Sequence, residues 1–229
     1  TQICQGVVKR GCEVGFIVDP DVDRLAIVCE NGKPFVEEYT LVSVADYVLS
    51  HTPGTTVSNM SSTKALRDVT EARGQRYFAS AVGEVNVVEK MKQENAVIGG
   101  EGNGGVIYPE LHYGRDALVG IALFLSLLAK SGKTCSALRA SYPNYEISKN
   151  KMELTPEMNV DLILEKMAKK YADCEVLTTD GVKIMFKDEW VHLRKSNTEP
   201  IIRIYSESRD MAAANALATK IMNEIKQLL

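Results

Sequence analysis

The first part of the chain divides into segments with different spacings of apolar residues. These spacings predict strands and helices that alternate along the chain. Strands are predicted at 14–18, 25–29, 55–60, 75–79 and 96–98. Helices are predicted at 1–12, 38–49, 63–73, 85–93 and 116–130. Strands and helices that alternate with short connections are typical of a parallel α/β sheet, so we expect one here.

The pattern changes after Pro143, where predicted strands follow one another. These strands are predicted at 145–154, 175–177, 182–186, 190–193 and 201–205, and helices at 156–171 and from Met211 onward. The first of these helices carries four apolar residues near one face, namely Leu162, Ile163, Leu164 and Met167. Strands in succession, flanked by helices, favour an α+β domain with an antiparallel sheet, and we place a domain boundary near 144–150.

Composition places the chain among soluble globular proteins and changes this picture little. Of its 229 residues 45% are hydrophobic and 25% are charged, and the net charge is −3, so no basic face predicts binding to nucleic acid. The longest apolar stretch, 117–129, is too short to span a membrane. Five cysteines without C-x-x-C spacing indicate a reduced, cytoplasmic protein with buried thiols. The chain opens on Thr-Gln-Ile-Cys, as a fragment that begins inside an element would.

A cluster of acidic residues follows the first predicted strand. Asp19, Asp21 and Asp23 stand at alternate positions, and Arg24 comes next. In an extended chain alternate side chains point to the same side, so the three carboxylates are expected to converge on one cation. Carboxylate oxygens suit Mg²⁺ or Ca²⁺ rather than zinc.

This cluster has two other interpretations. The acids and Glu30 stand at EF-hand positions 1, 3, 5 and 12, but the sixth position of that loop requires glycine and here holds Arg24, and the flanks are predicted strands, so the EF-hand is rejected. A solvated acidic turn is the structural alternative. The adjacent Arg24 disfavours it, because a cation beside a metal is useful mainly where phosphate must be bound.

The segment 99–105 contains five glycines and two polar side chains, Glu101 and Asn103. Glycines allow a backbone to approach a ligand closely, and Glu and Asn form hydrogen bonds with paired hydroxyls, so sugar recognition is a reasonable hypothesis. No Lys-Ser/Thr follows, which excludes a P-loop, and Tyr108-Pro109 separates the glycines from the next helix, unlike a dinucleotide-binding turn. A tight connection between elements is the alternative.

A basic loop is predicted between the last two strands. Arg194 and Arg203 bracket three short polar residues, Ser196, Asn197 and Thr198. Guanidinium groups match the geometry of phosphate, and backbone N–H groups in the turn add donors, so the loop is a candidate phosphate cradle. The alternative is a polar hairpin with surface arginines.

Together the three loops resemble the signature of the α-D-phosphohexomutase family, which includes phosphoglucomutase, phosphomannomutase and phosphoglucosamine mutase. The metal loop D-x-D-x-D-R is matched by Asp19, Asp21, Asp23 and Arg24. The sugar loop G-E-x-[SN]-G is matched by Gly100, Glu101, Asn103 and Gly104. The phosphate loop R-x-S-[NG]-T-E-P is matched by Arg194, Ser196, Asn197, Thr198, Glu199 and Pro200, with Arg203 beyond.

The resemblance implies a domain organisation and a mechanism. Residues 1–40 would end the second domain, an α/β domain; residues 41–145 would form the third, mixed α/β, domain; and residues 146–229 the smaller α+β fourth domain. A phosphoserine in the missing N-terminal domains would exchange phosphate with a hexose phosphate through a hexose 1,6-bisphosphate, moving phosphate between O1 and O6. Asp19, Asp21 and Asp23 would hold Mg²⁺, and Arg24 would stabilise the charge. Glu101 and Asn103 would bind the sugar, and the basic loop the non-reacting phosphate.

This sequence departs from the family pattern in two places. The catalytic serine motif, T-A-S-H-N-P, is not found. Ser58-Asn59 and Ser61-Ser62 are the nearest echoes, neither has the His or Pro, and Ser58 is predicted to lie on a core strand. The turn at Gly83-Glu84 carries Glu where several members have His, which leaves the preferred sugar open, although the form of the sugar loop favours the glucosamine- or mannose-phosphate branch. We therefore expect a fragment that is inactive alone. The alternative is a non-catalytic module that binds hexose phosphate or Mg²⁺.

Overall fold

The computed structural model describes residues 2–155, 159–196 and 199–228. Contacts between residues divide the chain into two compact units, which meet in sequence between Pro143 and Asn144. Each unit is described by itself.

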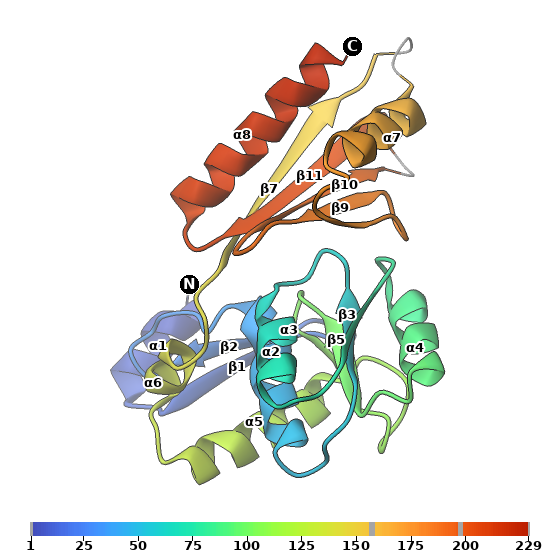
Figure 1. Ribbon diagram of the computed structural model, residues 1–229. Helices are drawn as coiled ribbons and strands as arrows, with labels where there is room; N and C mark the ends of the chain where they lie inside the picture. The colour runs from blue at the N-terminus through green and yellow to red at the C-terminus, as the bar shows by residue number, and fades with distance from the viewer. Residues whose placement is uncertain (1, 156–158, 197–198, 229) are drawn as a thin grey trace. The chain divides into compact units, whose positions relative to one another are not determined.

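The first unit is built from two sheets and six helices, drawn in blue to yellow-green in Figure 1. Its strands are β1 (Val14–Val18), β2 (Leu25–Cys29), β3 (Thr56–Asn59), β4 (Tyr77–Ser80), β5 (Ile98–Glu101) and β6 (Gly105–Ile107). Its helices are α1 (Gln2–Arg10), α2 (Glu37–Leu49), α3 (Ala65–Ala72), α4 (Glu84–Gln93), α5 (Ala117–Ser131) and α6 (Cys135–Ala140).

The larger sheet of this unit has the strand order β4-β3-β5-β6. β3 pairs in parallel with both β4 and β5, and β6 returns antiparallel to β5. The crossover from β3 to β4 and the crossover from β4 to β5 run in opposite directions across the sheet. Because such crossovers are right-handed, their helices α3 and α4 fall on opposite faces. Figure 1 shows this arrangement, with α2 beside α3 on one face and α4 on the other.

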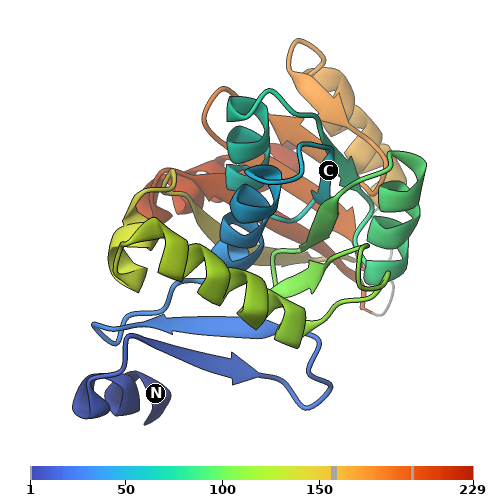
Figure 2. The same cartoon turned by 90° about the horizontal axis from the view of Figure 1, so that it is seen from below.

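The smaller sheet is the antiparallel β1–β2 hairpin, which lies beside α5 in Figure 2. Phe124 of α5 anchors it: its ring meets Phe16 of β1 and Phe35 after β2 edge-on, at centroid distances of 6.1 Å and 5.0 Å. Edge-to-face aromatic pairs at these distances stabilise a core beyond the area they bury. The segment 14–35 is therefore held by contacts within the first unit.

The second unit pairs one five-stranded sheet with two helices. Its strands are β7 (Glu146–Glu153), β8 (Glu175–Leu177), β9 (Val182–Met185), β10 (Trp190–Lys195) and β11 (Ile201–Ser208). Its helices are α7 (Val160–Lys170) and α8 (Met211–Gln227). All neighbours in the strand order β7-β11-β10-β9-β8 are antiparallel, as the sequence predicts for an α+β domain.

The core of the second unit lies between the sheet and its helices. Ile163, Leu164 and Met167 of α7 are buried there with the alternate, apolar positions of β9, β10 and β11. Leu162 is 46% exposed, so the prediction that it shares this face is wrong. It directly precedes the buried pair Ile163 and Leu164, and the narrow apolar stripe of a surface helix has no room for a third residue in succession.

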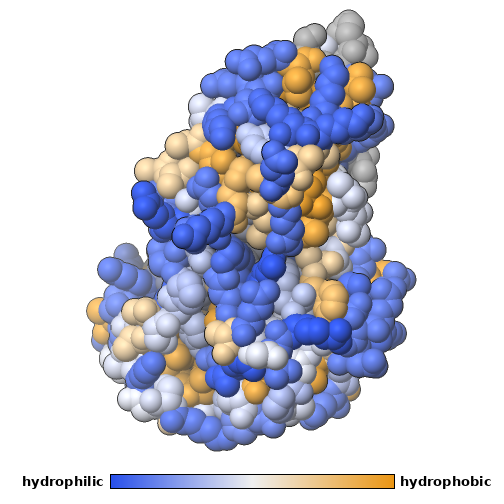
Figure 3. All heavy atoms as spheres, in the orientation of Figure 1, coloured by the Kyte–Doolittle hydropathy of each residue, from blue (hydrophilic) through white to orange (hydrophobic). Residues whose placement is uncertain are grey.

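Two further predictions from composition have clear outcomes. All five cysteines are free, and Cys29 and Cys135 are buried, but Cys12 is exposed, so the expectation of buried thiols is wrong there. Among the described residues, no helix is both long and apolar enough to cross a membrane. On the face shown in Figure 3, the first unit is mostly hydrophilic with small apolar patches, and the second unit carries a broader apolar area at its centre.

Candidate functional site

The predicted metal loop, 19–24, connects β1 and β2, whose last register pair is Val18 with Leu25. The loop is a turn: the N–H of Val22 donates to the carbonyl of Asp19 at 3.0 Å, and Val22 has a φ of 57°. The expectation that an extended chain directs the three carboxylates to one side is therefore wrong. A hairpin that reverses direction within six residues cannot keep the alternation of a strand.

The carboxylates of this loop have different environments. Oδ1 of Asp19 accepts the N–H groups of Asp23 and Arg24, at 3.1 Å and 3.2 Å. Burial tends to raise the pKa of Asp19, but the neighbouring Asp23 carboxyl, these two donors and the Arg24 charge together lower it. Burial and the Asp19 carboxyl raise the pKa of Asp23. Asp21 is exposed, and the half-exposed Arg24 lies 3.8 Å from Asp19.

Across the part of the chain that the structure describes, no set of three or more His, Cys, Asp or Glu side chains is arranged to hold a metal ion. Magnesium binding by Asp19, Asp21 and Asp23 thus stays a prediction. One feature of the loop does fit a cation. Oδ1 of Asp23 is buried and has no hydrogen-bond partner among the described residues, and a buried carboxylate oxygen in this condition is costly unless a ligand satisfies it.

The glycine-rich segment is a hairpin rather than the loop expected from the sequence. β5 begins two residues later than the predicted strand at 96–98 and runs through Glu101, and the unpredicted β6 pairs with it. A Cβ at Gly99 would lie 2.6 Å from Sδ of Met91, and one at Gly100 would lie 2.0 Å from the carbonyl oxygen of Gly105. These glycines are required because the hairpin strands and α4 pack closely.

The two predicted sugar-binding side chains stand on this hairpin. Glu101 is 5% exposed, and its Oε1 accepts from Nδ2 of Asn59 at 2.8 Å and from the N–H of Gly83 at 3.3 Å. Asn103 is exposed at the turn, where its Oδ1 accepts the N–H of Gly105 at 3.1 Å. Sugar binding by Glu101 and Asn103 stays a prediction.

One backbone hydrogen bond joins the two hairpins, and a second joins the 19–24 loop to α5. The N–H of Leu25, at the end of the 19–24 loop, donates to the carbonyl of Gly104 at 3.0 Å. The N–H of Ala117, the first residue of α5, donates to the carbonyl of Val22 at 3.0 Å. The predicted metal loop, the predicted sugar loop and the start of α5 therefore form one cluster in the first unit.

Arg115 is the residue at this junction that sequence reasoning missed. Its Nη1 lies 2.6 Å from Oε2 of Glu101, and its Nη2 is paired with Oδ2 of Asp23. Glu84 accepts the backbone N–H of Arg115 at 2.9 Å and lies 3.4 Å from its Nε. The signal in the sequence was an arginine directly before the predicted helix at 116–130, but its three acidic partners are far from it along the chain.

The predicted phosphate loop lies in the second unit, between β10 and β11. Arg194 and Arg203 are register partners on these antiparallel strands, so their side chains leave the same face of the sheet. Arg194 lies 3.5 Å from Asp180, and Arg203 lies 3.7 Å from Glu199. The N–H of Ser196 donates to the carbonyl of Ile201 at 3.0 Å. Asn197 and Thr198 lie outside the described residues.

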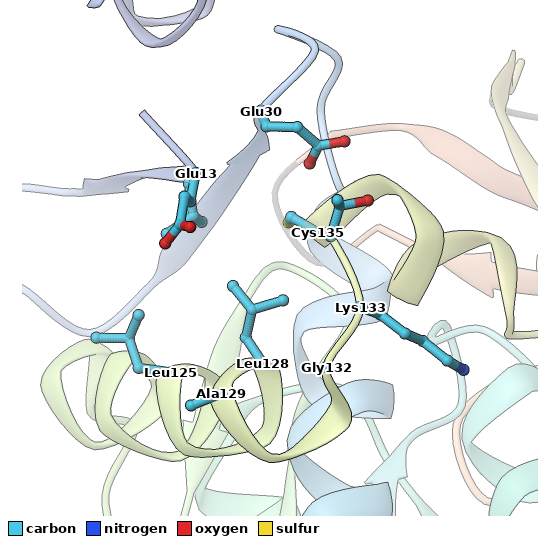
Figure 4. Close-up of a pocket in the computed structure, with 10 residues that line it drawn as sticks. Glu13, Glu30, Leu125, Leu128, Ala129, Gly132, Lys133 and Cys135 are labelled. Carbon is cyan, nitrogen blue, oxygen red and sulfur yellow. The ribbon is translucent and has the colours of Figure 1, made fainter. Parts of the chain in front are cut away.

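A cavity of about 430 Å³ also opens in the first unit, between the β1–β2 hairpin and α5. Figure 4 shows Leu125, Leu128 and Ala129 on the α5 side and Glu13 and Glu30 on the other. None of its lining residues belongs to the three loops. Two carboxylates at its rim disfavour a phosphorylated ligand.

Comparison with known families covers most of the chain. The family model described as phosphoglucomutase/phosphomannomutase, alpha/beta/alpha domain III, matches residues 37–145. The model described as phosphoglucomutase/phosphomannomutase, C-terminal domain, matches residues 151–224. The chain belongs to the phosphoglucomutase/phosphomannomutase family. The family expected from the three motifs is thereby confirmed, as is the mixed α/β fold.

Individual members of the family agree. A phosphoglucomutase/phosphomannomutase from Thermococcus kodakarensis is 36% identical over 220 residues, covering 93% of this chain and 48% of that protein. A phosphoglucosamine/phosphogalactosamine mutase from Sulfurisphaera tokodaii is 41% identical over 150 residues, covering 65% of this chain and 32% of that protein. The crystal structure of a family protein from Burkholderia thailandensis superposes with a TM-score of 0.83 at 26% identity, covering 98% of this chain and 48% of that one. This chain thus spans about half the length of such phosphoglucomutase/phosphomannomutase proteins.

Proposed function

We propose that this chain carries the metal-, sugar- and phosphate-binding loops of a phosphohexomutase, an isomerase that moves phosphate between O1 and O6 of a hexose phosphate. The observation that carries the proposal is the junction at Arg115. Asp23 of one family motif and Glu101 of another stand on separate hairpins, yet both contact the same guanidinium group. Motifs that converge in this way form one site.

The first unit would hold the cation and the sugar. Asp19, Asp21 and Asp23 would bind Mg²⁺. Oδ1 of Asp23 supports this assignment, because it accepts no hydrogen bond from the described residues, although Nε of Arg24 lies 3.7 Å away. Magnesium, when bound, neutralises charge on a transferring phosphoryl group. Arg24, which is half exposed beside these acids, would contribute positive charge to the same group. Glu101 would accept hydrogen bonds from sugar hydroxyls, and the amide of the exposed Asn103 would donate one.

The second unit would hold the non-reacting phosphate. Two like charges directly opposite each other on neighbouring strands destabilise a sheet. Arg194 and Arg203 are in this position, and Asp180 and Glu199 offset their charges from 3.5 Å and 3.7 Å. A bound phosphate would give both guanidinium groups a shared anion and two charge-assisted interactions. Ser196, together with Asn197 and Thr198, would add neutral donors to this cradle.

The phosphoserine and its domain would come from the half of the relatives that this chain does not span. A hexose 1,6-bisphosphate would be the intermediate and activator, and glucose, mannose or glucosamine phosphate the substrate. We propose a cytoplasmic location, in line with the five free cysteines. The chain alone is expected to bind without turnover. A non-catalytic module that binds hexose phosphate or Mg²⁺ is the second candidate.

A chimera tests the activity. This chain replaces the matching C-terminal half of the Thermococcus kodakarensis relative, and conversion of the 1-phosphates of glucose, mannose and glucosamine to 6-phosphates is followed. We expect turnover of at least one of them, and loss of that turnover with Arg194→Ala, Arg203→Ala. The circular dichroism spectrum and thermal unfolding of the substituted chimera, compared with those of the unsubstituted chimera, control for folding.

The two candidate functions give different results in this assay. A folded chimera that turns over none of the three sugars while still binding their phosphates would support the non-catalytic module. A folded chimera that neither binds nor converts these sugar phosphates would contradict the proposal.

A further inference from the structure

Arg115 occupies a position that no motif accounts for. Its side chain is 13% exposed, and its guanidinium meets three carboxylates, those of Asp23, Glu84 and Glu101. Its backbone is fixed as well, because Arg115 forms an antiparallel bridge with Ile107 at the end of β6. Because the main chain of Arg115 is fixed and its guanidinium is planar, the side chain can change its contacts with these carboxylates only by small shifts.

The three partners belong to different parts of the site. Asp23 stands on the predicted metal loop, Glu101 on the predicted sugar hairpin, and Glu84 at the first turn of α4. Nη2 faces Oδ2 of Asp23, which leaves Oδ1 of the same carboxylate without a hydrogen-bond partner among the described residues. Nε of Arg115 also lacks a hydrogen bond, although Oε2 of Glu84 lies 3.4 Å away. The guanidinium is therefore shared among its acids, and none of them satisfies it fully.

We propose that Arg115 is a positioning residue that couples cation binding at Asp23 to the charge of Glu101 and its contact with Arg115. This inference rests on the proposed function, because it takes Asp23 as a cation ligand and Glu101 as a sugar ligand. A cation at Asp23 repels the guanidinium and moves its charge toward Glu101 and Glu84. Conversely, when the interaction between Glu101 and Arg115 is weakened, the guanidinium interacts more strongly with Asp23. Its positive charge then competes with the cation there.

The same geometry explains the glutamate at position 84. This turn carries Glu where several family members have His. Both oxygens of Glu84 face Arg115, one its backbone N–H and one its Nε. Glu84 thus acts as the third restraint on the guanidinium, which links this departure from the family pattern to Arg115.

The test is a double-mutant cycle on this chain with Mn²⁺ alone, measured by titration calorimetry. Glu101→Gln is expected to raise the Kd for Mn²⁺ about fivefold or more, the lower end of typical coupling between sites. In an Arg115→Gln background the same substitution is expected to change the Kd by less than about twofold, because only long-range charge remains. Glu110→Gln, which removes an exposed charge that is bonded to Tyr108 rather than Arg115, is the matched control.

A second variant keeps the test decisive if Arg115→Gln does not fold, since it leaves three carboxylates without their cation. Glu84→Gln retains the acceptor for the backbone N–H of Arg115 and frees its Nε, so it is expected to weaken Mn²⁺ binding in the same direction as Glu101→Gln. Equal effects of Glu101→Gln in both backgrounds, or no effect of Glu84→Gln, would overturn the coupling while leaving the proposed function intact. Mn²⁺ binding that is absent, or unchanged by Asp23→Asn, would overturn both.

Discussion

The backbone N–H of Leu25 donates to the carbonyl of Gly104 at 3.0 Å, and this bond ties the hairpin of the acidic loop to the hairpin of the glycine-rich segment. The approach is close enough that a Cβ at position 104 would lie 2.3 Å from the carbonyl oxygen of Leu25. Gly104 also has a φ of 88°, a conformation that other residues rarely adopt. The junction between the two loops therefore depends on glycine at this position.

Gly104→Ala is expected to lower the free energy of unfolding of the first unit by at least about 2 kcal/mol, because the added methyl group meets backbone and the positive φ becomes strained. Urea denaturation followed by circular dichroism measures the change.

Gly6→Ala is the matched control for that substitution. Gly6 lies in α1, and a Cβ added there would have nothing within 4 Å, so alanine is expected to be neutral or to stabilise by about 0.4–1 kcal/mol. If the two substitutions have equal effects, the close approach of Leu25 and Gly104 is not a constraint on the fold.

The start of α5 gives a second prediction. Oδ1 of Asp116 accepts the N–H groups of Leu118 and Val119 at 2.8 Å and 3.0 Å and so caps the helix. Asp116→Ala is expected to cost about 1 kcal/mol of stability, the usual effect of losing such a cap. Asp116→Asn keeps the cap oxygen and is expected to restore most of the loss in thermal denaturation. An Asn variant as unstable as the Ala variant would show that the cap is not the source of the effect.

Most of the elements could be predicted because their patterns are local. The helix 117–131 begins at its Asp116 cap and ends at Gly132, which has the left-handed φ of 63° that glycine favours. In the same way, three isoleucines and a tyrosine within 201–205, residue types that favour strands, indicate β11, which runs on to Ser208.

The elements that were missed have no such pattern. β6 has only three residues, Gly105–Ile107, and two of the four residues of β5 are glycines, so neither strand shows a side-chain alternation. α6 spans only six residues. The role of Arg115 was hidden for a different reason. Its partners come from three segments that only the fold brings together, and no spacing along the chain marks such a set.

His192 gives a prediction about pH. It is buried on β10, and its Nε2 donates to the carbonyl of Asp180 at 2.6 Å. Burial lowers the pKa of His192 to about 4, while the Asp180 carbonyl opposes the shift and the nearby charges of Lys183 and Arg194 add to it. The unfolded chain, with a histidine pKa of about 6.5, binds the proton more readily, so stability is lost as the pH falls from about 6.5 toward 4.

Between pH 7 and pH 5 this loss is expected to reach about 2 kcal/mol, measured as the change in the free energy of unfolding in urea. His192→Gln is expected to remove most of this pH dependence, whereas His51→Gln, at an exposed histidine, is expected to leave it unchanged. An unaltered pH dependence in His192→Gln would assign it to other groups.

The central claim, that Arg194 and Arg203 hold the phosphate of a hexose phosphate, is tested most directly by calorimetric titration of this chain with glucose, mannose and glucosamine 6-phosphates. Arg10→Ala, Arg209→Ala is the matched control, because it removes the same charge from two exposed arginines. We predict binding of at least one sugar phosphate by the chain and by the control, and a loss of at least about 100-fold in affinity with Arg194→Ala, Arg203→Ala, as two charge-assisted contacts are removed. Equal affinity in the two double variants, or no binding by the unaltered chain, would contradict the claim.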